Sequence, residues 1–198
     1  PDLLSNHRTL FPVFLPGAHA IPLAINCSCV ASNLHIYIAR GIKTRTADLK
    51  IARPHIMIVV PRVLEKVYNA ASQKAGSGPK GRVFAASVVA AQKYMKEVSE
   101  NGKASRFVSM QRNAFDPLVY ASIREALGGC AKWIVTGGAP LDPDLMAFFR
   151  GAGIPVYEGY GLTETTAPCA FNPLTVPYHP GSVGIPFPGS PPPSGRGN

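Results

Sequence analysis

Long apolar runs, paired cysteines and acidic charge are all scarce in this chain of 198 residues. No stretch approaches the roughly 18 consecutive apolar residues that a membrane-spanning helix needs. The cysteines form one C-x-C pair and two distant singles, a spacing that fits neither a zinc ribbon nor a disulfide framework: Cys27, Cys29, Cys130 and Cys169. We therefore expect reduced cysteines packed in a cytosolic protein.

The first half of the chain has far fewer acidic residues than basic ones. Residues 1–112 carry 16 of the 20 Lys and Arg residues against five acidic residues, whereas residues 113–198 carry four against six. The basic residues are scattered, and their spacing relative to aromatic residues does not suggest a strand platform for bases, so we expect no nucleic-acid binding. A solvated basic face and weak attachment of residues 74–112 to an anionic membrane both remain open.

The chain has enough apolar residues to build a core. Hydrophobic residues make up 46% of it, which excludes a disordered segment and suits one core or part of a larger one. Strands are predicted at residues 55–60, 131–135 and 154–160. Helices are predicted at residues 61–75, 82–98, 142–153, and from Asp116–Pro117 to Gly128–Gly129. This alternation predicts an α/β fold with a mainly parallel sheet flanked by helices.

Two glycine-rich turns follow predicted strands. TGGAP (136–140) follows the strand at 131–135, and GYGLTET (159–165) follows the strand segment IPVYE. Ligands of parallel sheets bind at the carboxyl ends of the strands. If these two strands are neighbours, both turns open on the same edge of the sheet.

The residue types in the first turn suit close contact with a ligand. Gly137 and Gly138 let the backbone approach a ligand closely or adopt a positive φ, and Pro140 stiffens the exit of the turn.

The second turn adds groups that would recognise a nucleotide. Gly159 and Gly161 flank Tyr160 and leave one ring face open to a planar group. Thr163 supplies a hydroxyl for a phosphate, and Glu164 supplies a hard oxygen that suits Mg²⁺. Base, phosphate and magnesium together indicate a nucleotide, although the residues alone also allow a plain turn followed by a helix cap.

Longer segments carry a family resemblance. VTGGAPLDPDLMAFFRGAGIPVYEGYGLTETTAP (135–168) resembles the adenylate-forming, AMP-binding enzymes, and GSVGIPFPG (181–189) resembles the stretch that follows their nucleotide motif. FLPGAHA (14–20) is similar to the long-chain fatty-acid–CoA ligases among them. The segment VVPRVLEKVYNAASQKAGSGPKGRVFAA (59–86) is similar to the long-chain fatty-acid–CoA ligases, or acyl-CoA synthetases, among them. The chain thus resembles a central fragment of the large N-terminal domain of such a ligase.

The resemblance implies an activity in which ATP activates a long-chain fatty acid to acyl-AMP plus pyrophosphate, and coenzyme A then displaces AMP. It implies that Tyr160 stacks on adenine, that Thr163 contacts the α-phosphate and that Glu164 holds Mg²⁺, the last two being catalytic. It also implies that the following residues line the nucleotide: Gly137, Gly138, Ala139, Pro140, Gly159 and Gly161. His19 would lie near the substrate passage.

Some parts of the family pattern are missing from these residues. The family has a Ser/Thr/Gly-rich phosphate loop, which GSGPKG (76–81) does not match, because it lacks threonines and lies between two predicted helices. The family's ribose-binding aspartate and C-terminal catalytic lysine are also not found. The chain begins without Met, and we expect it to be an excerpt that is inactive alone.

We assign residues 1–189 to a partial AMP-binding domain and residues 190–198 to a non-matching, disordered tail. The resemblance implies a cytoplasmic location, with peripheral attachment to the inner face of a membrane as an option. Two other interpretations stay open: a non-catalytic remnant that binds a nucleotide or a partner, and a piece of another adenylate-forming enzyme.

Overall fold

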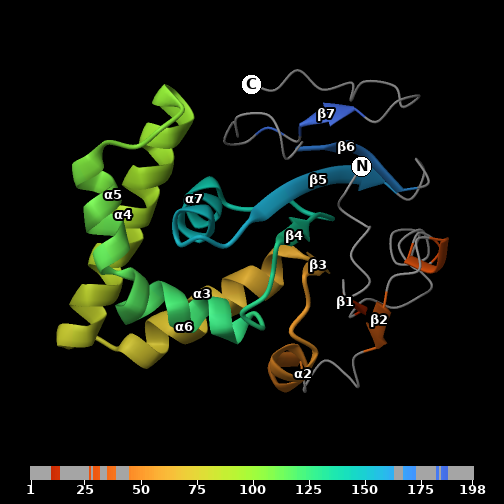
Figure 1. Cartoon of the computed structure of the whole chain (residues 1–198), viewed down its shortest axis with the longest axis horizontal. Helices are drawn as coiled ribbons and strands as arrows, with labels where there is room; N and C mark the ends of the chain where they lie inside the picture. Colours follow the sequence, from red (N-terminus) through yellow and green to blue (C-terminus); the bar gives the residue numbers. More distant parts are fainter. Residues whose placement is uncertain are drawn as a thin grey trace.

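The computed structural model describes residues 10–13, 27, 29–31, 35–38, 45–162, 167–172, 182 and 184–186 (Figure 1). The described strands are β1 (Leu10–Val13), β2 (His35–Ile38), β3 (Ile56–Val59), β4 (Trp133–Thr136), β5 (Val156–Leu162), β6 (Ala167–Phe171) and β7 (Ile185–Pro186). The described helices are α2 (Arg45–Ala52), α3 (Pro61–Ala75), α4 (Pro79–Asn101), α5 (Arg106–Ala114), the π-helical turn η1 (Asp116–Tyr120), α6 (Ala121–Ala126) and α7 (Pro143–Gly151).

The main sheet has five strands in the order β3-β4-β5-β6-β7. The pairs β3–β4 and β4–β5 are parallel, whereas β5–β6 and β6–β7 are antiparallel. Strands β1 and β2 form a separate parallel pair, and β1 contacts β3. The predicted α/β class is confirmed, but the sheet is mixed, because β6 and β7 add an antiparallel half that the sequence did not predict.

The three predicted strands form the parallel half of this sheet. In β3 and β4, alternate residues are buried, as expected for strands with one face against a helical layer. Met57, Ile134 and Val156 make one fully buried row across the three strands. Short runs rich in β-branched residues therefore locate these strands correctly.

Helix α7 begins where Asp142–Pro143 predicts. The Asp142 Oδ1 atom accepts a hydrogen bond from Leu145 N at 2.9 Å, and Pro143 occupies the first turn, where its missing N–H costs nothing. This helix start is confirmed.

The second Asp–Pro pair does not cap a helix. Asp116 and Pro117 lie in η1, which continues directly from α5 because Val119 N and Tyr120 N both donate to Phe115 O. The Asp116 carboxylate instead accepts two hydrogen bonds from Arg124 at 2.7 and 2.8 Å. The predicted helix cap at Asp116 is therefore wrong. The predicted end of the helix is confirmed, because Gly128 and Gly129 adopt positive φ after α6.

Helix α5 was not predicted from the sequence. Ser105 caps it by accepting a hydrogen bond from Val108 N, and Ser105 N donates to the Glu97 carboxylate of α4 at 2.7 Å. Helices α4 and α5 pack on each other, and α4 also packs on α7. The α4–α5 pair lies at the far side of the molecule from β1 and β2 (Figure 1).

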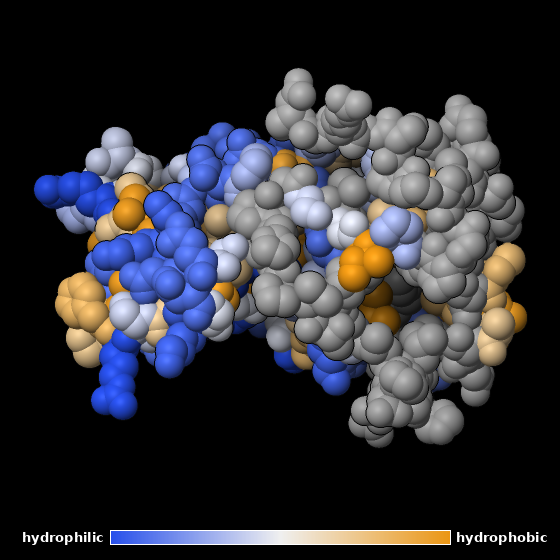
Figure 2. Space-filling view, turned by 90° about the horizontal axis from the view of Figure 1, so that it is seen from above, coloured by the Kyte–Doolittle hydropathy of each residue, from blue (hydrophilic) through white to orange (hydrophobic). Residues whose placement is uncertain are grey.

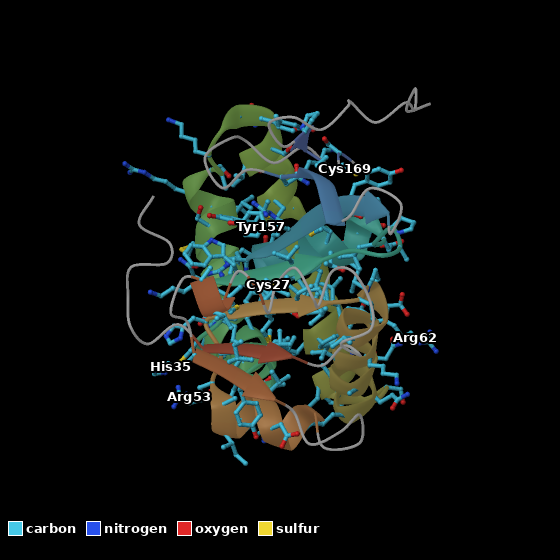
Figure 3. All side chains as sticks on the ribbon, turned by 90° about the vertical axis from the view of Figure 1, so that its right-hand side faces the viewer. Cys27, His35, Arg53, Arg62, Tyr157 and Cys169 are labelled. Atoms are coloured by element: carbon cyan, nitrogen blue, oxygen red, sulfur yellow. The ribbon has the colours of Figure 1, made fainter. Side chains whose placement is uncertain are left out.

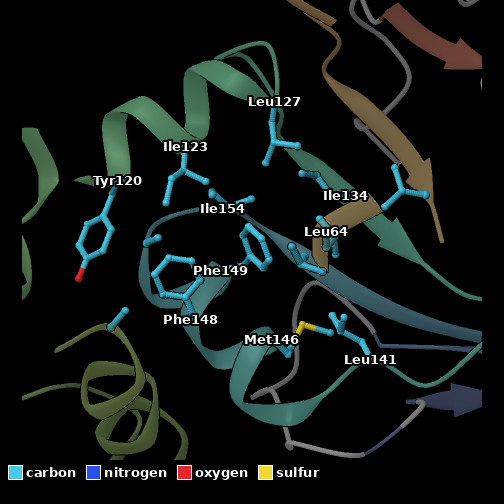
Figure 4. Close-up of a cluster of buried hydrophobic side chains, with 14 of the residues drawn as sticks. Leu64, Tyr120, Ile123, Leu127, Ile134, Leu141, Met146, Phe148, Phe149 and Ile154 are labelled. Carbon is cyan, nitrogen blue, oxygen red and sulfur yellow. The ribbon is translucent and has the colours of Figure 1, made fainter. Parts of the chain in front are cut away.

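The core lies between the parallel strands and helices α3, α6 and α7 (Figure 4). Phe148 and Phe149 of α7 have ring centroids 5.4 Å apart and are fully buried. Large side chains of the same helix and of other parts of the chain close around them: Leu64, Tyr120, Ile123, Leu127, Ile134, Met146 and Ile154. Burial of each such side chain contributes about 1.5–3 kcal/mol, and the core fixes β4 and β5 on their helical layer.

Candidate nucleotide-binding site

The two glycine-rich segments meet at one edge of the sheet. Strands β4 and β5 are parallel neighbours, with Thr136 opposite Glu158. Residues 137–140 and residues 159–161 therefore both come directly after the last parallel-paired residues of β4 and β5, at the carboxyl-terminal edge of the sheet. The condition for both segments to open on the same edge, that these strands are neighbours, is met.

The turn after β4 touches β5 through its first glycine. A Cβ atom at Gly137 would lie 2.9 Å from Gly159 O, so only a glycine allows this approach without a shift of the backbone. Gly138 has a φ of 83°, and nothing lies within 4 Å of the position where its Cβ would be. Because Gly138, Ala139 and Pro140 are exposed, a ligand can approach this backbone closely.

The second glycine segment belongs to β5 as far as Leu162, whereas the sequence predicted a strand that ends at residue 160 and a turn over residues 159–165. Gly159, Tyr160 and Gly161 belong to β5 and pair with β6, with a register irregularity between Tyr160 and Gly161. The antiparallel partner extends the strand beyond the predicted end at residue 160. Tyr160 is 37% exposed, so part of its ring is accessible to a planar group.

Some predicted site residues cannot be located. Thr163, Glu164 and His19 lie outside the described residues. Within the described ranges, no group of three or more His, Cys, Asp or Glu side chains is arranged to hold a metal ion.

Glu158 is a residue of this site that the sequence analysis missed. The residue is only 8% exposed, and its Oε1 atom accepts a hydrogen bond from Leu141 N at 3.0 Å. The signal in the sequence was an acidic residue within an otherwise apolar strand, directly before Gly159.

Thr136 adds a second buried polar group. The residue is completely buried, and its Oγ1 atom has no hydrogen-bond partner within the described part of the chain. Thr136 and Glu158 are opposite each other on neighbouring strands, so their side chains point to the same face of the sheet.

GSGPKG is not a phosphate loop after a strand. It connects α3 to α4, and Pro79 occupies the first turn of α4. The interpretation of this segment as a helix connection is confirmed.

No disulfide bond joins cysteines in the described part of the chain. Cys29 and Cys169 are buried, as expected for packed cysteines, whereas Cys27 is exposed and departs from that expectation. Figure 3 labels Cys169 on β6 and Cys27 in a different part of the chain. Burial raises the pKa of the Cys29 thiol, which keeps that side chain protonated at neutral pH. Among the helices of the described residues, none is both long and apolar enough to cross a membrane.

Curated proteins similar to this chain are long-chain fatty-acid–CoA ligases. Ligase FadD15 of Mycobacterium bovis is 40% identical over 193 residues, which are 96% of this chain and 31% of that protein. Human long-chain-fatty-acid–CoA ligase 6 is 34% identical over 182 residues, which are 88% of this chain and 24% of that protein. The chain therefore spans a third or less of the length of these relatives.

Solved structures show the same fold at low sequence identity. O-succinylbenzoate coenzyme A synthetase from Bacillus subtilis, in complex with AMP, matches with a TM-score of 0.56 and 14% identity over 92% of this chain and 27% of that one. The A domain of carboxylic acid reductase from Segniliparus rugosus, in complex with AMP and a carboxylic acid, matches with a TM-score of 0.52 and 23% identity over 82% and 22%.

The resemblance seen in the sequence motifs is thus confirmed by similarity along nearly the whole chain. Residues 4–191 match the family described as AMP-binding enzyme, which covers both glycine-rich segments and the strands before them. The chain belongs to the family of AMP-binding enzymes.

Proposed function

We propose that this chain is part of a long-chain fatty-acid–CoA ligase. Such an enzyme activates a fatty acid with ATP to acyl-AMP plus pyrophosphate, and then transfers the acyl group to coenzyme A. The observation that carries the proposal is the contact of the turn at Gly137 with Gly159, in a chain 40% identical to part of FadD15. This contact brings the two segments that are expected to hold ATP to one edge of the sheet. We also propose that the protein is located in the cytoplasm.

The described residues fit a nucleotide. The exposed ring of Tyr160 would stack on adenine, and the open backbone at Gly138 would allow the base and ribose to approach. We propose that Thr163 contacts the α-phosphate and that Glu164 holds Mg²⁺. A bound Mg²⁺ would neutralise the negative charge that accumulates when the carboxylate attacks the α-phosphate.

Calorimetric titration of the chain with ATP in the presence of MgCl₂ tests the nucleotide site. We expect the wild type to bind, and we expect Tyr160→Ala to weaken binding about tenfold or more, because stacking of a base on an aromatic ring is worth about 1–3 kcal/mol. Tyr160→Phe is the matched control and should bind like the wild type. Glu164→Ala should remove the dependence of binding on Mg²⁺. No ATP binding by the wild type would contradict the proposed site in this chain.

Turnover separates the ligase from its alternatives. We expect no acyl-CoA formation by residues 1–198 alone, because the family's phosphate loop and catalytic lysine are not recognised in them. The gene on either side of this segment should encode both in one open reading frame, and that longer protein should form thioesters of long-chain fatty acids. Thioesters formed only with other carboxylic acids would indicate another adenylate-forming enzyme, and stop codons on both sides would indicate a binding remnant.

A second proposed property is peripheral attachment to an anionic membrane through α4 and α5. Phe107 and Met110 of α5 are each 65% exposed, and Val89 of α4 is 64% exposed. Figure 2 shows hydrophilic residues interspersed with apolar ones at this end of the molecule. The exposed basic side chains of α4, α5 and the turn between them are Lys80, Arg82, Lys93, Lys96, Lys103 and Arg106. Apolar side chains within a basic surface suit anionic lipid headgroups.

Vesicle sedimentation tests this attachment. We expect binding to vesicles that contain phosphatidylserine, weaker binding at high salt, and little binding to pure phosphatidylcholine. The double change Lys103→Glu and Arg106→Glu should reduce binding strongly. Arg62→Glu on α3 is the control and should have little effect. Binding that ignores both salt and lipid charge would contradict the proposal.

A further inference from the structure

Glu158 occupies a position in β5 where an apolar side chain would be expected. Strand residues two apart point to the same face, and Val156 on that face is fully buried in the core. Glu158 is 8% exposed, and no basic side chain of the described residues forms an ion pair with it. Burial of an unpaired carboxylate is unfavourable, so this residue is a poor choice for stability alone.

The Glu158 side chain is directed to the exit of the first glycine turn. Its Oε1 atom accepts the hydrogen bond from Leu141 N at 3.0 Å, within a buried environment. The Leu141 side chain is itself buried in the core. The residue after Pro140 is therefore held at two points, by its side chain and by its backbone N–H.

The Glu158 backbone connects to a third segment. Glu158 O accepts a hydrogen bond from Asn172 N at 3.3 Å, after the end of β6. The buried Asn172 side chain donates in turn to Ser182 O at 2.6 Å. Ser182 lies in the segment 181–189 that resembles the family downstream of the nucleotide motif. Glu158 thus bonds directly to the exit of the first turn and is linked to the segment 181–189 through Asn172.

We infer that Glu158 is a positioning residue that holds the Gly137–Pro140 turn against β5 through its hydrogen bond to Leu141 N. The inference rests on the proposed nucleotide site, because this turn is one of its two walls. Glu158 acts through the backbone that it anchors and does not have to touch the nucleotide. The contact between Gly137 and Gly159 sets how close the two segments come at one end of the turn, and Glu158 fixes the other end.

Two substitutions separate this role from a general contribution to stability. Glu158→Met keeps the length of the side chain but removes the acceptor, and an apolar side chain suits the buried position. Glu158→Gln keeps an Oε1 acceptor and removes the charge. We expect Glu158→Met to keep the melting temperature and to weaken ATP binding about tenfold, whereas Glu158→Gln should bind ATP within about threefold of the wild type.

A matched control lies at the start of α7. Asp142→Ala removes a hydrogen bond of the same kind, from Leu145 N to the Asp142 carboxylate, outside the turn. Amide hydrogen exchange, measured without nucleotide, reports directly on the hydrogen bonds of the Leu141 and Leu145 amides. Glu158→Met should accelerate exchange of the Leu141 amide about tenfold or more, and Asp142→Ala should accelerate only Leu145 and leave ATP affinity unchanged.

The outcomes distinguish this inference from the proposed function. If the wild type binds no ATP, the proposed nucleotide site fails, and the positioning role fails with it. If the wild type binds ATP and Glu158→Met binds it equally well, only the positioning role is overturned. Equal losses of affinity in Glu158→Met and Glu158→Gln would also overturn it, because the charge and not the hydrogen bond would then matter.

Discussion

A Cβ atom at Gly137 would lie 2.9 Å from the carbonyl oxygen of Gly159, closer than packed atoms in proteins normally approach. This contact joins the turn after β4 to β5 where the two glycine segments meet. The neighbouring atom is a backbone oxygen, which cannot rotate away as a side chain can. The distance between the two segments therefore depends on the absence of a side chain at residue 137.

Gly137→Ala should push the turn away from β5. We expect the free energy of unfolding to fall by about 1–3 kcal/mol, as for other overpacked sites, and ATP affinity to fall with it. Urea denaturation and calorimetric titration measure the two effects. Gly78→Ala is the control, since its Cβ would meet nothing within 4 Å and its φ of −79° suits any residue. Unchanged ATP affinity in Gly137→Ala would contradict the role of the contact.

The sequence predicted the parts of the fold that depend on local patterns. Met57, Ile134 and Val156 lie in short apolar runs between breaks, and those runs form the parallel strands. Asp142 caps α7 through a bond to a residue three positions along the chain. Gly137 and Gly138 likewise predicted the position of the first turn, because glycine favours turns through its local backbone conformation.

The parts that depend on distant partners were not predictable. Asp116–Pro117 has the same residue types as Asp142–Pro143, but it does not begin a helix, because the helical backbone of α5 continues through Phe115 into η1. The Asp116 carboxylate accepts hydrogen bonds from Arg124 instead. Gly161 and Leu162 lie in a strand beyond the predicted end because β6 pairs with them. The bond between Glu158 and Leu141 spans 17 positions, and no local pattern indicates it.

The Asp116–Arg124 pair should make stability sensitive to acid. The hydrogen bonds from Arg124 hold the pKa of the Asp116 carboxyl below its usual value. The unfolded chain then binds the proton more readily, so this contribution to stability is complete above the unfolded pKa of about 4 and is lost as the pH falls through the lower folded pKa. Asp116→Asn should lower stability at pH 7 and flatten its dependence on pH below about 4.

Urea denaturation at pH 7, 4 and 3 measures this effect. Glu97 is the comparison, because its pKa is also lowered, chiefly by the hydrogen bond from Ser105 N. Glu97→Gln should keep the part of the pH dependence that belongs to Asp116. An equally steep loss of stability in acid for Asp116→Asn and the wild type would show that the Asp116–Arg124 pair does not cause it.

Helix α7 should tolerate no side chain at Gly151. A Cβ atom there would overlap Ala91 O of α4, and Arg112 Nε donates to Gly151 O at 2.7 Å at the same crossing. Gly151→Ala should separate α4 from α7 and lower the free energy of unfolding by about 1–3 kcal/mol or more. Thermal denaturation measures this, with Gly78→Ala as the control. A gain in stability, as expected for alanine in an uncrowded helix, would mean that the crossing is looser than described.

The buried hydroxyl of Thr136 should cost stability. Thr136 is fully buried, and its Oγ1 has no hydrogen-bond partner among the described residues. Thr136→Val replaces the hydroxyl by a methyl group of similar shape, so we expect the free energy of unfolding to rise by about 1 kcal/mol and the melting temperature by about 2–4 °C. Thr136→Ser keeps the hydroxyl but loses the methyl group, and should destabilise the protein.

A loss of stability in Thr136→Val would instead mean that the hydroxyl has a partner in solution. The facing residue on the same side of the sheet is Glu158, whose Oε1 atom already bonds to Leu141 N. A double-mutant cycle of Thr136→Val with Glu158→Met decides this, because a coupling energy near zero excludes the partnership. A coupling of about 1 kcal/mol would show that Thr136 donates to the Glu158 carboxylate, and the turn at Gly137–Pro140 would then be held by a network rather than by one bond.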